Sequence, residues 1–100
     1  MEEKHYRHSR AMLDTQEALL GSVVPSLRSV TVNIDVERKI LYFAFFYDGE
    51  VTDEFAQLAH NVCNKVGANF PAYVVDRKIE RLDFPKKIPL SGRYAYFRNE

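Results

Sequence analysis

The sequence predicts an α+β fold, a two-layer sandwich in which a four-stranded, mostly antiparallel sheet carries two helices on one face, in the order α-β-β-α-β-β. Three features of the sequence lead to this prediction. Apolar residues recur at helical spacing in two segments, they alternate with polar residues in a third, and they run unbroken from Ile40 to Tyr47. A chain of 100 residues has room for one core, so residues 1–100 are expected to form a single domain.

The first element is expected to be a helix. The chain begins with a polar segment, residues 1–9, that is expected to be frayed at its start, and the helical pattern predicts a helix over about residues 6–21. Gly21 and Pro25 mark its exit. The stripe that faces the core is expected to consist of Met12, Leu13, Leu19, Leu20 and Val23.

A β-hairpin is expected next. Valine and isoleucine alternate with polar residues in residues 29–36, which is typical of a strand with one face in solvent. The charged residues 37–39 form the turn, and residues 40–47 form the returning strand. Five of the eight residues in that returning strand are aromatic, so either both of its faces are buried or one face is available to a partner.

The second helix has the clearest signals in the chain. Thr52 stands at the N-cap position, and Asp53 and Glu54 follow in the first turn, where the helix dipole favours negative charge. Apolar residues at helical spacing continue to Val66, and Gly67 is expected just beyond the last turn.

Two further strands complete the predicted sheet. The alternation of side chains predicts one strand over about residues 70–79 and another over residues 93–98. Between them, residues 83–92 contain two prolines and a glycine and are expected to form a loop. Two helices can cover one face of such a sheet, so its other face is expected to meet solvent or a partner.

Composition restricts the location and the kind of partner. The formal net charge is zero, which argues against nucleic-acid binding through bulk electrostatics. Cys63 is the only cysteine in the sequence, so an intrachain disulfide cannot form, and we expect a reducing compartment, the cytoplasm. No apolar stretch resembles a signal peptide or a membrane helix, so we expect no membrane association.

Two histidine-containing pairs have spacings that suit a catalytic or metal site. His5 and His8 are three apart, but no nearby residues complete a tetrahedral zinc site, so a solvated segment is expected. His60 and Cys63 could form a nucleophile–base pair, but Cys63 borders an apolar stripe and is expected to be a buried structural thiol. We therefore expect no enzyme activity, no metal and no cofactor.

Two other interpretations of the sequence stay open. Phe43 and Phe45 resemble the stacking aromatics of sheets that bind single-stranded RNA, and the C-terminal third is basic. The zero net charge and the element order argue against RNA binding, which is kept as an alternative. A homodimer through the open face of the sheet is the other alternative.

Five short motifs carry a resemblance to a known group of proteins. They are Ala18-Leu19-Leu20-Gly21, Pro25-Ser26-Leu27-Arg28-Ser29-Val30, Phe46-Tyr47-Asp48-Gly49-Glu50, Phe70-Pro71 and Tyr96-Phe97-Arg98-Asn99-Glu100. Their order over about residues 16–100 resembles small bacterial immunity proteins, the cognate inhibitors of toxins in contact-dependent growth inhibition and related polymorphic systems. The resemblance implies a cytoplasmic protein that binds one toxin domain, commonly a nuclease, and blocks it.

The contact surface is expected to be acidic, because a nuclease cleft that holds phosphates is basic. Four carboxylates lie close together between the aromatic strand and the second helix, although a loop and a helix first turn also explain most of them. The expected contact residues are Asp48, Glu50, Asp53 and Glu54 as the main acidic surface, Asp35 and Glu37 as additions, and Tyr42 and Tyr47 as aromatic anchors.

Overall fold

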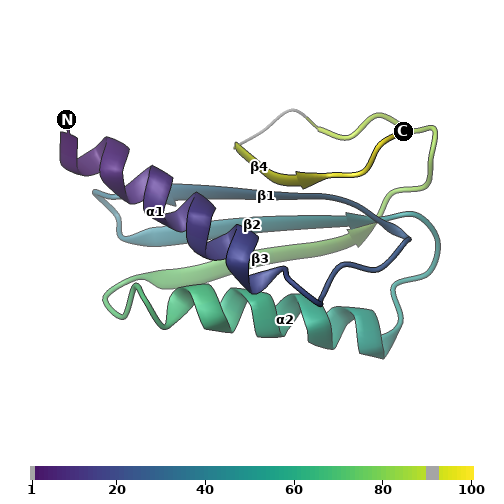
Figure 1. Cartoon of the computed structure of the whole chain (residues 1–100), viewed down its shortest axis with the longest axis horizontal. Helices are drawn as coiled ribbons and strands as arrows, with labels where there is room; N and C mark the ends of the chain where they lie inside the picture. Colours follow the sequence, from purple (N-terminus) through teal and green to yellow (C-terminus); the bar gives the residue numbers. More distant parts are fainter. Residues whose placement is uncertain (1, 90–92) are drawn as a thin grey trace.

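The computed structural model describes residues 2–89 and 93–100, with side chains from Arg7 onward in the first helix. The elements are α1 (Glu2–Ala18), β1 (Leu27–Asp35), β2 (Ile40–Tyr47), α2 (Asp53–Gly67), β3 (Val74–Arg81) and β4 (Arg93–Phe97). This confirms the α+β class and the predicted element order (Figure 1). No helix in the described part of the chain is long and apolar enough to cross a membrane.

The sheet is mixed, with the strand order β3-β2-β1-β4. The β1–β2 hairpin and the β1–β4 pair are antiparallel, whereas β2 and β3 pair in parallel. The prediction of a mostly antiparallel sheet is therefore corrected at β3. The physical reason is that α2 carries the chain back along the sheet, so β3 starts at the same end as β2.

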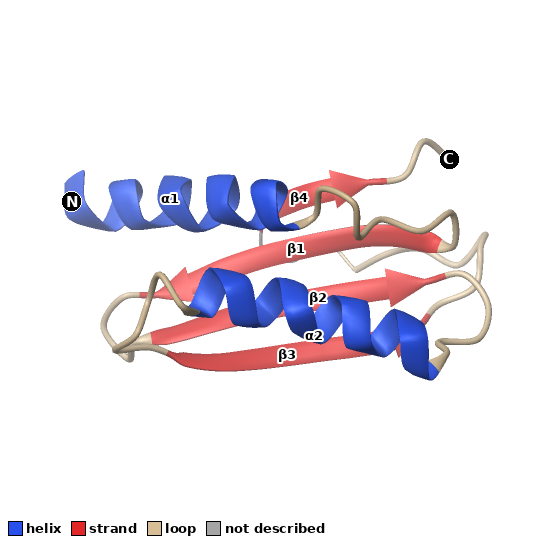
Figure 2. Cartoon of the chain, turned by 60° about the horizontal axis from the view of Figure 1, so that its bottom comes forward, coloured by secondary structure: helices blue, strands red, loops and turns tan. Residues whose placement is uncertain are grey.

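In Figure 1 α1 crosses in front of the strands and α2 runs below β3, and in Figure 2 α2 lies in front of β2 and β3. Helix α1 contacts β1 and β4, α2 contacts β2 and β3, and the two helices contact each other. The core lies between the helices and the strand side chains that face them. Its buried members include Val30, Val32, Ile34, Leu41, Phe43, Phe45, Tyr47, Ala59, Val62, Cys63 and Val66.

Helix α1 differs from the expectation in its bounds and in its buried face. It begins at Glu2, where a frayed segment was expected, and ends at Ala18. Ala11, Thr15 and Ala18, at helical spacing, are buried together with Asp14, whereas Leu13 is 58% exposed. Leu20 and Val23 lie beyond the helix end and are also exposed, so the predicted apolar stripe is wrong at these positions. Small residues on the buried face allow a helix to approach its neighbours closely.

Helix α2 follows its sequence signals at one end and departs from them at the other. Thr52 caps the helix, because its hydroxyl accepts a hydrogen bond from the Phe55 backbone N–H at 3.1 Å. Gly67 lies inside the helix, and Ala68 is the C-cap. A Cβ atom on Gly67 would lie 3.0 Å from Cγ2 of Val75, so close packing of α2 on β3 explains the glycine.

Candidate protein-binding surface

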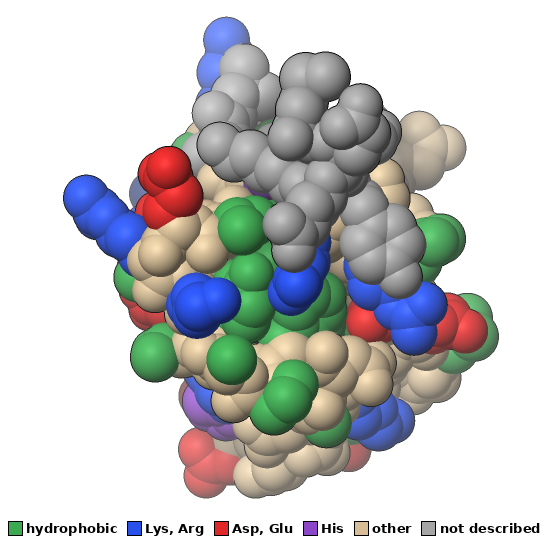
Figure 3. All heavy atoms as spheres, turned by 90° about the vertical axis from the view of Figure 1, so that its left-hand side faces the viewer, with side chains coloured by type: hydrophobic (Ala, Val, Ile, Leu, Met, Phe, Trp, Pro, Cys, Tyr) green, Lys and Arg blue, Asp and Glu red, His purple; other side chains and the backbone are tan. Residues whose placement is uncertain are grey.

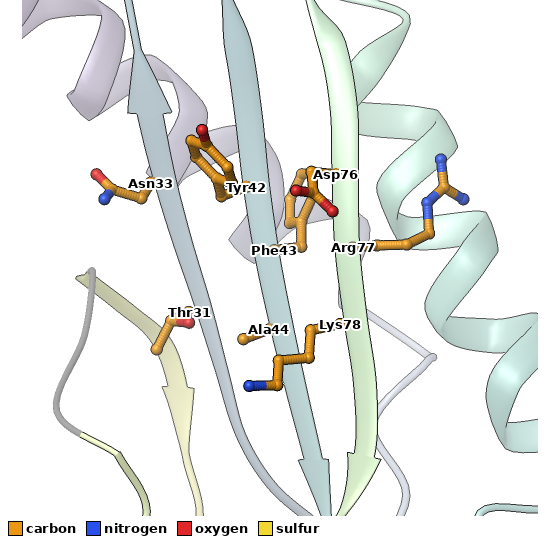
Figure 4. Close-up of a pocket in the computed structure, with 8 residues that line it drawn as sticks. All are labelled: Thr31, Asn33, Tyr42, Phe43, Ala44, Asp76, Arg77 and Lys78. Atoms are coloured by element: carbon orange, nitrogen blue, oxygen red, sulfur yellow. The ribbon is translucent and has the colours of Figure 1, made fainter.

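The side of the sheet that faces away from the helices contains a groove of about 580 Å³ (Figure 4). Three strands line this groove: β1 with Thr31 and Asn33, β2 with Tyr42 and Ala44, and β3 with Asp76 and Lys78. The lining also includes Phe43 and Arg77. The Arg77 side chain points away from the groove towards α2, where Nη1 lies 3.0 Å from Nδ1 of His60. Polar and charged side chains therefore surround the groove, although most of its accessible surface is apolar, and Tyr42 is the aromatic ring available in it.

The two faces of the aromatic strand β2 have different surroundings. Alternate residues of β2, from Leu41 to Tyr47, point into the core. On the other face, Phe46 is only 4% exposed and lies beneath the Lys78 ammonium, which is 5.9 Å from the ring centre. Tyr42 and Ala44 are partly exposed. On the face of β2 that points away from the core, Phe46 is thus covered, whereas Tyr42 is accessible to a partner.

A cluster of ion pairs lies at the end of the sheet where β2 ends. We call Arg28, Asp48, Arg98 and Glu100 the C-terminal ion-pair cluster. Arg28 is 2% exposed, and its guanidinium donates to both carboxylate oxygens of Glu100, at 2.7 and 2.8 Å, and to the Leu82 carbonyl at 2.6 Å. Arg98 donates to Asp48 at 3.1 Å. These contacts join three of the sequence motifs that lie far apart in the chain.

The pKa values in this region follow the same contacts. Hydrogen bonds from Arg28 hold the pKa of Glu100 below its ordinary value, and the interaction with Glu100 raises the pKa of Arg28. Hydrogen bonds from Arg81 and from the Gly49 backbone N–H lower the pKa of Asp83. These two carboxylates are therefore charged and engaged within the chain at neutral pH.

The structure separates the predicted acidic residues into two groups. Asp48 belongs to the C-terminal ion-pair cluster, and its Oδ1 also accepts from the Phe84 backbone N–H at 3.3 Å. We call the exposed residues Glu50, Asp53 and Glu54, at the start of α2, the helix-end acidic patch.

The other two predicted acids lie at the far end of the sheet. Asp35 ends β1 and Glu37 lies in the β1–β2 turn, which is separated from the helix-end acidic patch by the length of β2, about 26 Å. Asp35 accepts a hydrogen bond from the Arg38 backbone N–H at 3.0 Å, within the turn. This end of the molecule shows basic and hydrophobic side chains as well as acidic ones (Figure 3).

Tyr47 does not lie on the surface where an aromatic anchor was predicted. It is 2% exposed, and its ring stacks on Phe55 with a centroid distance of 5.8 Å. Burial raises its pKa to about 12. A buried ring offers no contact area to a partner, so this expectation is corrected, and Tyr42 is the accessible member of the pair.

The aromatic pair that suggested RNA binding is also buried. Phe43 and Phe45 are 3% and 1% exposed, on the helix-facing side of β2. They pack in the core and offer no ring for a base to stack on, so that interpretation of Phe43 and Phe45 is wrong.

The remaining candidate chemistry has structural explanations. Cys63 is fully buried, and burial raises the pKa of its thiol to about 11, which keeps it protonated at neutral pH. His60 contacts Arg77. The side chain of His5 lies outside the described residues. Among the residues that are described, no group of three or more histidine, cysteine or acidic side chains is arranged to hold a metal ion.

A second hollow, of about 320 Å³, was missed by the sequence analysis. Its lining includes Phe84 and Ile88 from the loop after β3, Tyr94 and Phe97 of β4, and Lys87. Phe84 and Phe97 are 52% and 51% exposed. The only sign of this hollow in the sequence was the presence of two bulky apolar residues, Phe84 and Ile88, in a proline-rich loop. The sequence does not say which surface they join, because that depends on how the loop folds.

Comparison with models of protein families gives a match that covers most of the chain. A protein-family model described as MafI2 immunity protein matches residues 8–100. The match covers both helices, apart from the first residues of α1, and all four strands. Among curated proteins, no sequence matches the chain.

Proposed function

Because the chain belongs to the MafI2 immunity protein family, we propose that it binds one cognate bacterial toxin and neutralises it by protein–protein contact. The family match carries this proposal. It is supported by a sheet face with an open groove and by a buried, protonated Cys63 thiol, which is unsuited to nucleophilic catalysis. We assign the protein a steric role with no catalytic step.

We further propose that the toxin is a nuclease, that it belongs to a contact-dependent or related polymorphic system, and that inhibition takes place in the cytoplasm. Immunity must act where the toxin meets its substrate. A nuclease presents a basic cleft, and the helix-end acidic patch offers three exposed carboxylates. Opposite potentials of this kind chiefly raise the rate of association.

The helix-end acidic patch is our first choice for the contact with that cleft. Asp48 ranks below these three residues, because Arg98 and the Phe84 backbone already engage its carboxylate. Tyr42, with Asp35 and Glu37 towards the turn, forms a separate group that we propose as the second choice. The two groups lie at opposite ends of β2 and can be tested separately.

Charge reversal tests the acidic patch. The double variant Glu50→Lys/Asp53→Lys is expected to slow association with the toxin domain encoded in the neighbouring reading frame about 10-fold or more at low salt. The difference from the unmodified chain should shrink as salt is added. Stopped-flow association rates at several salt concentrations measure it.

Glu17→Lys is the matched control for this experiment. Glu17 is exposed, and it lies in a hollow with Lys65 and Asn69 at the other end of α2. Its reversal should leave the rate close to that of the unmodified chain. Equal rates for the double variant and the control would reject the acidic patch and leave the Tyr42 group as the candidate. No binding by the unmodified chain would reject the proposed function itself.

A further inference from the structure

The hollow next to β4 has the composition of an interface core. Phe84 and Phe97 each expose about half of their surface, and both line the same hollow with Tyr94 and Ile88. Clustered exposed aromatic rings are uncommon on a protein that works alone, and such rings dominate the energetics of protein contacts. We call this site the β4 aromatic pocket.

Contacts within the chain hold the walls of the β4 aromatic pocket in place. The Tyr94 hydroxyl donates to the Pro89 carbonyl at 3.2 Å, which ties the loop to β4. Tyr94 and Phe97 meet edge to face with centroids 5.1 Å apart. The Arg28 guanidinium lies 5.7 Å from the centre of the Phe84 ring and is itself fixed by Glu100. A pocket that is already ordered loses little entropy when it is filled.

The rim of the β4 aromatic pocket is positively charged. The exposed Lys87 lines it, and the exposed Lys86 and Arg93 are sequence neighbours of the lining residues Lys87 and Tyr94. Arg28 and Glu100 also line the pocket and pair with each other, Glu100 further pairs with Arg98, and the nearby Asp83 pairs with Arg81. Lys87 therefore remains as the positive charge of the lining, and an occupant that inserts an apolar side chain gains most if it carries acidic residues.

We propose that the β4 aromatic pocket binds an acidic segment of the toxin domain that places one apolar or aromatic side chain between Phe84 and Phe97. This inference rests on the proposed function. It gives the toxin domain a second contact site, which is opposite in charge to the helix-end acidic patch. Asp48 and Gly49 connect the two sites, because they contact Phe84 and Asp83 through hydrogen bonds. Adjacent sites of opposite charge fix the orientation of a partner.

Two variants test the pocket in different ways. Phe97→Ala removes one wall, and Lys87→Glu reverses one rim charge without removing any aromatic packing. The probe is the toxin domain encoded in the neighbouring reading frame, purified in an inactive form. Calorimetry should show Kd raised about 10-fold or more by Phe97→Ala and several-fold by Lys87→Glu. Leu20→Ala and Lys65→Glu, at exposed positions away from the pocket, are the matched controls and should leave Kd unchanged.

The outcomes separate the two proposals. If the unmodified chain binds the toxin domain and both pocket variants bind equally well, the pocket is rejected and the proposed function stands. If the unmodified chain does not bind, both fail. A 12-nucleotide single-stranded RNA is titrated in parallel at low salt, because exposed aromatics with lysines also suit nucleic acid. If the unmodified chain binds this RNA and both Phe97→Ala and Lys87→Glu abolish that binding, the proposal of a protein occupant is overturned.

Discussion

Glu100 shows how much a single side chain contributes to the organisation of this protein. Its carboxylate accepts two hydrogen bonds from Arg28, which is almost fully buried, and one more from Arg98. Removing this side chain would leave the buried guanidinium with the Leu82 carbonyl as its remaining hydrogen-bond partner among the described residues. A buried cation without its counter-charge is costly, so Glu100 is expected to be a stabilising residue.

We predict that Glu100→Gln lowers the free energy of unfolding at pH 7 by about 1–2 kcal/mol, because hydrogen bonds between charged groups are weakened. Urea denaturation measures the change. Asn99→Ala, at the exposed neighbouring position, should have no effect. An unchanged midpoint for Glu100→Gln would show that the ion pair adds nothing to stability.

The same pair predicts a pH dependence. The pKa of Glu100 is lower in the folded chain than its ordinary value of 4.5, so the unfolded state binds more protons as the pH falls. The stabilisation is complete above about pH 4.5 and is lost as the pH falls through the folded-state pKa. The difference between the unmodified chain and Glu100→Gln should therefore shrink as the pH is lowered from neutral to below 4.5. A constant difference would contradict this assignment.

Among the helices and strands, the contact between α2 and β3 depends on one glycine. Gly67 lies in the last turn of α2, where alanine would be the better helix former, yet a Cβ there would be 3.0 Å from Val75. The position is therefore governed by packing between elements and not by the conformational freedom of glycine.

A double-mutant cycle tests this explanation. Gly67→Ala alone is expected to destabilise the protein, because the new methyl group forces α2 and Val75 apart. In a Val75→Ala background the same change should stabilise it by about 0.5–1 kcal/mol through helix propensity. Thermal or urea denaturation of the four proteins gives the coupling energy. Equal effects of Gly67→Ala in both backgrounds would show that Val75 is not the obstacle.

For the molecule as a whole, the strand order of the mixed sheet determines which backbone N–H groups are protected from hydrogen exchange with solvent. Strands β1 and β2 are central, and β3 is an edge strand. The backbone N–H groups of Val74 and Leu82 donate to β2 or its flank. Because alternate residues of a strand direct their N–H groups to opposite sides, Asp76, Lys78 and Glu80 also face β2, whereas Val75, Arg77 and Ile79 face outwards.

Hydrogen exchange followed by NMR should show this pattern. Amides of the central strands, such as Phe43, are expected to exchange slowest. The amides of Val75, Arg77 and Ile79 should exchange at least about 10-fold faster than those of Asp76, Lys78 and Glu80. Uniform protection along β3 would mean that another strand or chain covers its outer edge.

The predictions made from sequence were accurate where the signal was local. The β1–β2 hairpin follows from an alternating segment, a charged turn and an apolar run, and the start of α2 follows from Thr52 and the acids after it. The first helix was predicted less well, because Leu13 and Leu20 fit a helical period but the buried face consists of smaller residues. Periodicity alone does not say which of two faces a helix buries.

The candidate site depended more on distant contacts than the elements did. The exposure of Glu50, Asp53 and Glu54 agrees with their place in a loop and a helix first turn. The sequence could not show that Asp48 is bound to Arg98, or that Tyr47 is stacked in the core, because both depend on residues brought together by folding.

The sequence by itself determined the α+β class, the order of the elements and the capping of α2, since each depends on residues within a few positions of one another. Only the tertiary structure decided the parallel placement of β3, the closure of the sheet end by Arg28 and Glu100, and the exposure of Phe84 and Phe97 together. These features require segments far apart in the chain to meet. Which segments meet depends on how the core packs, and no local pattern records it.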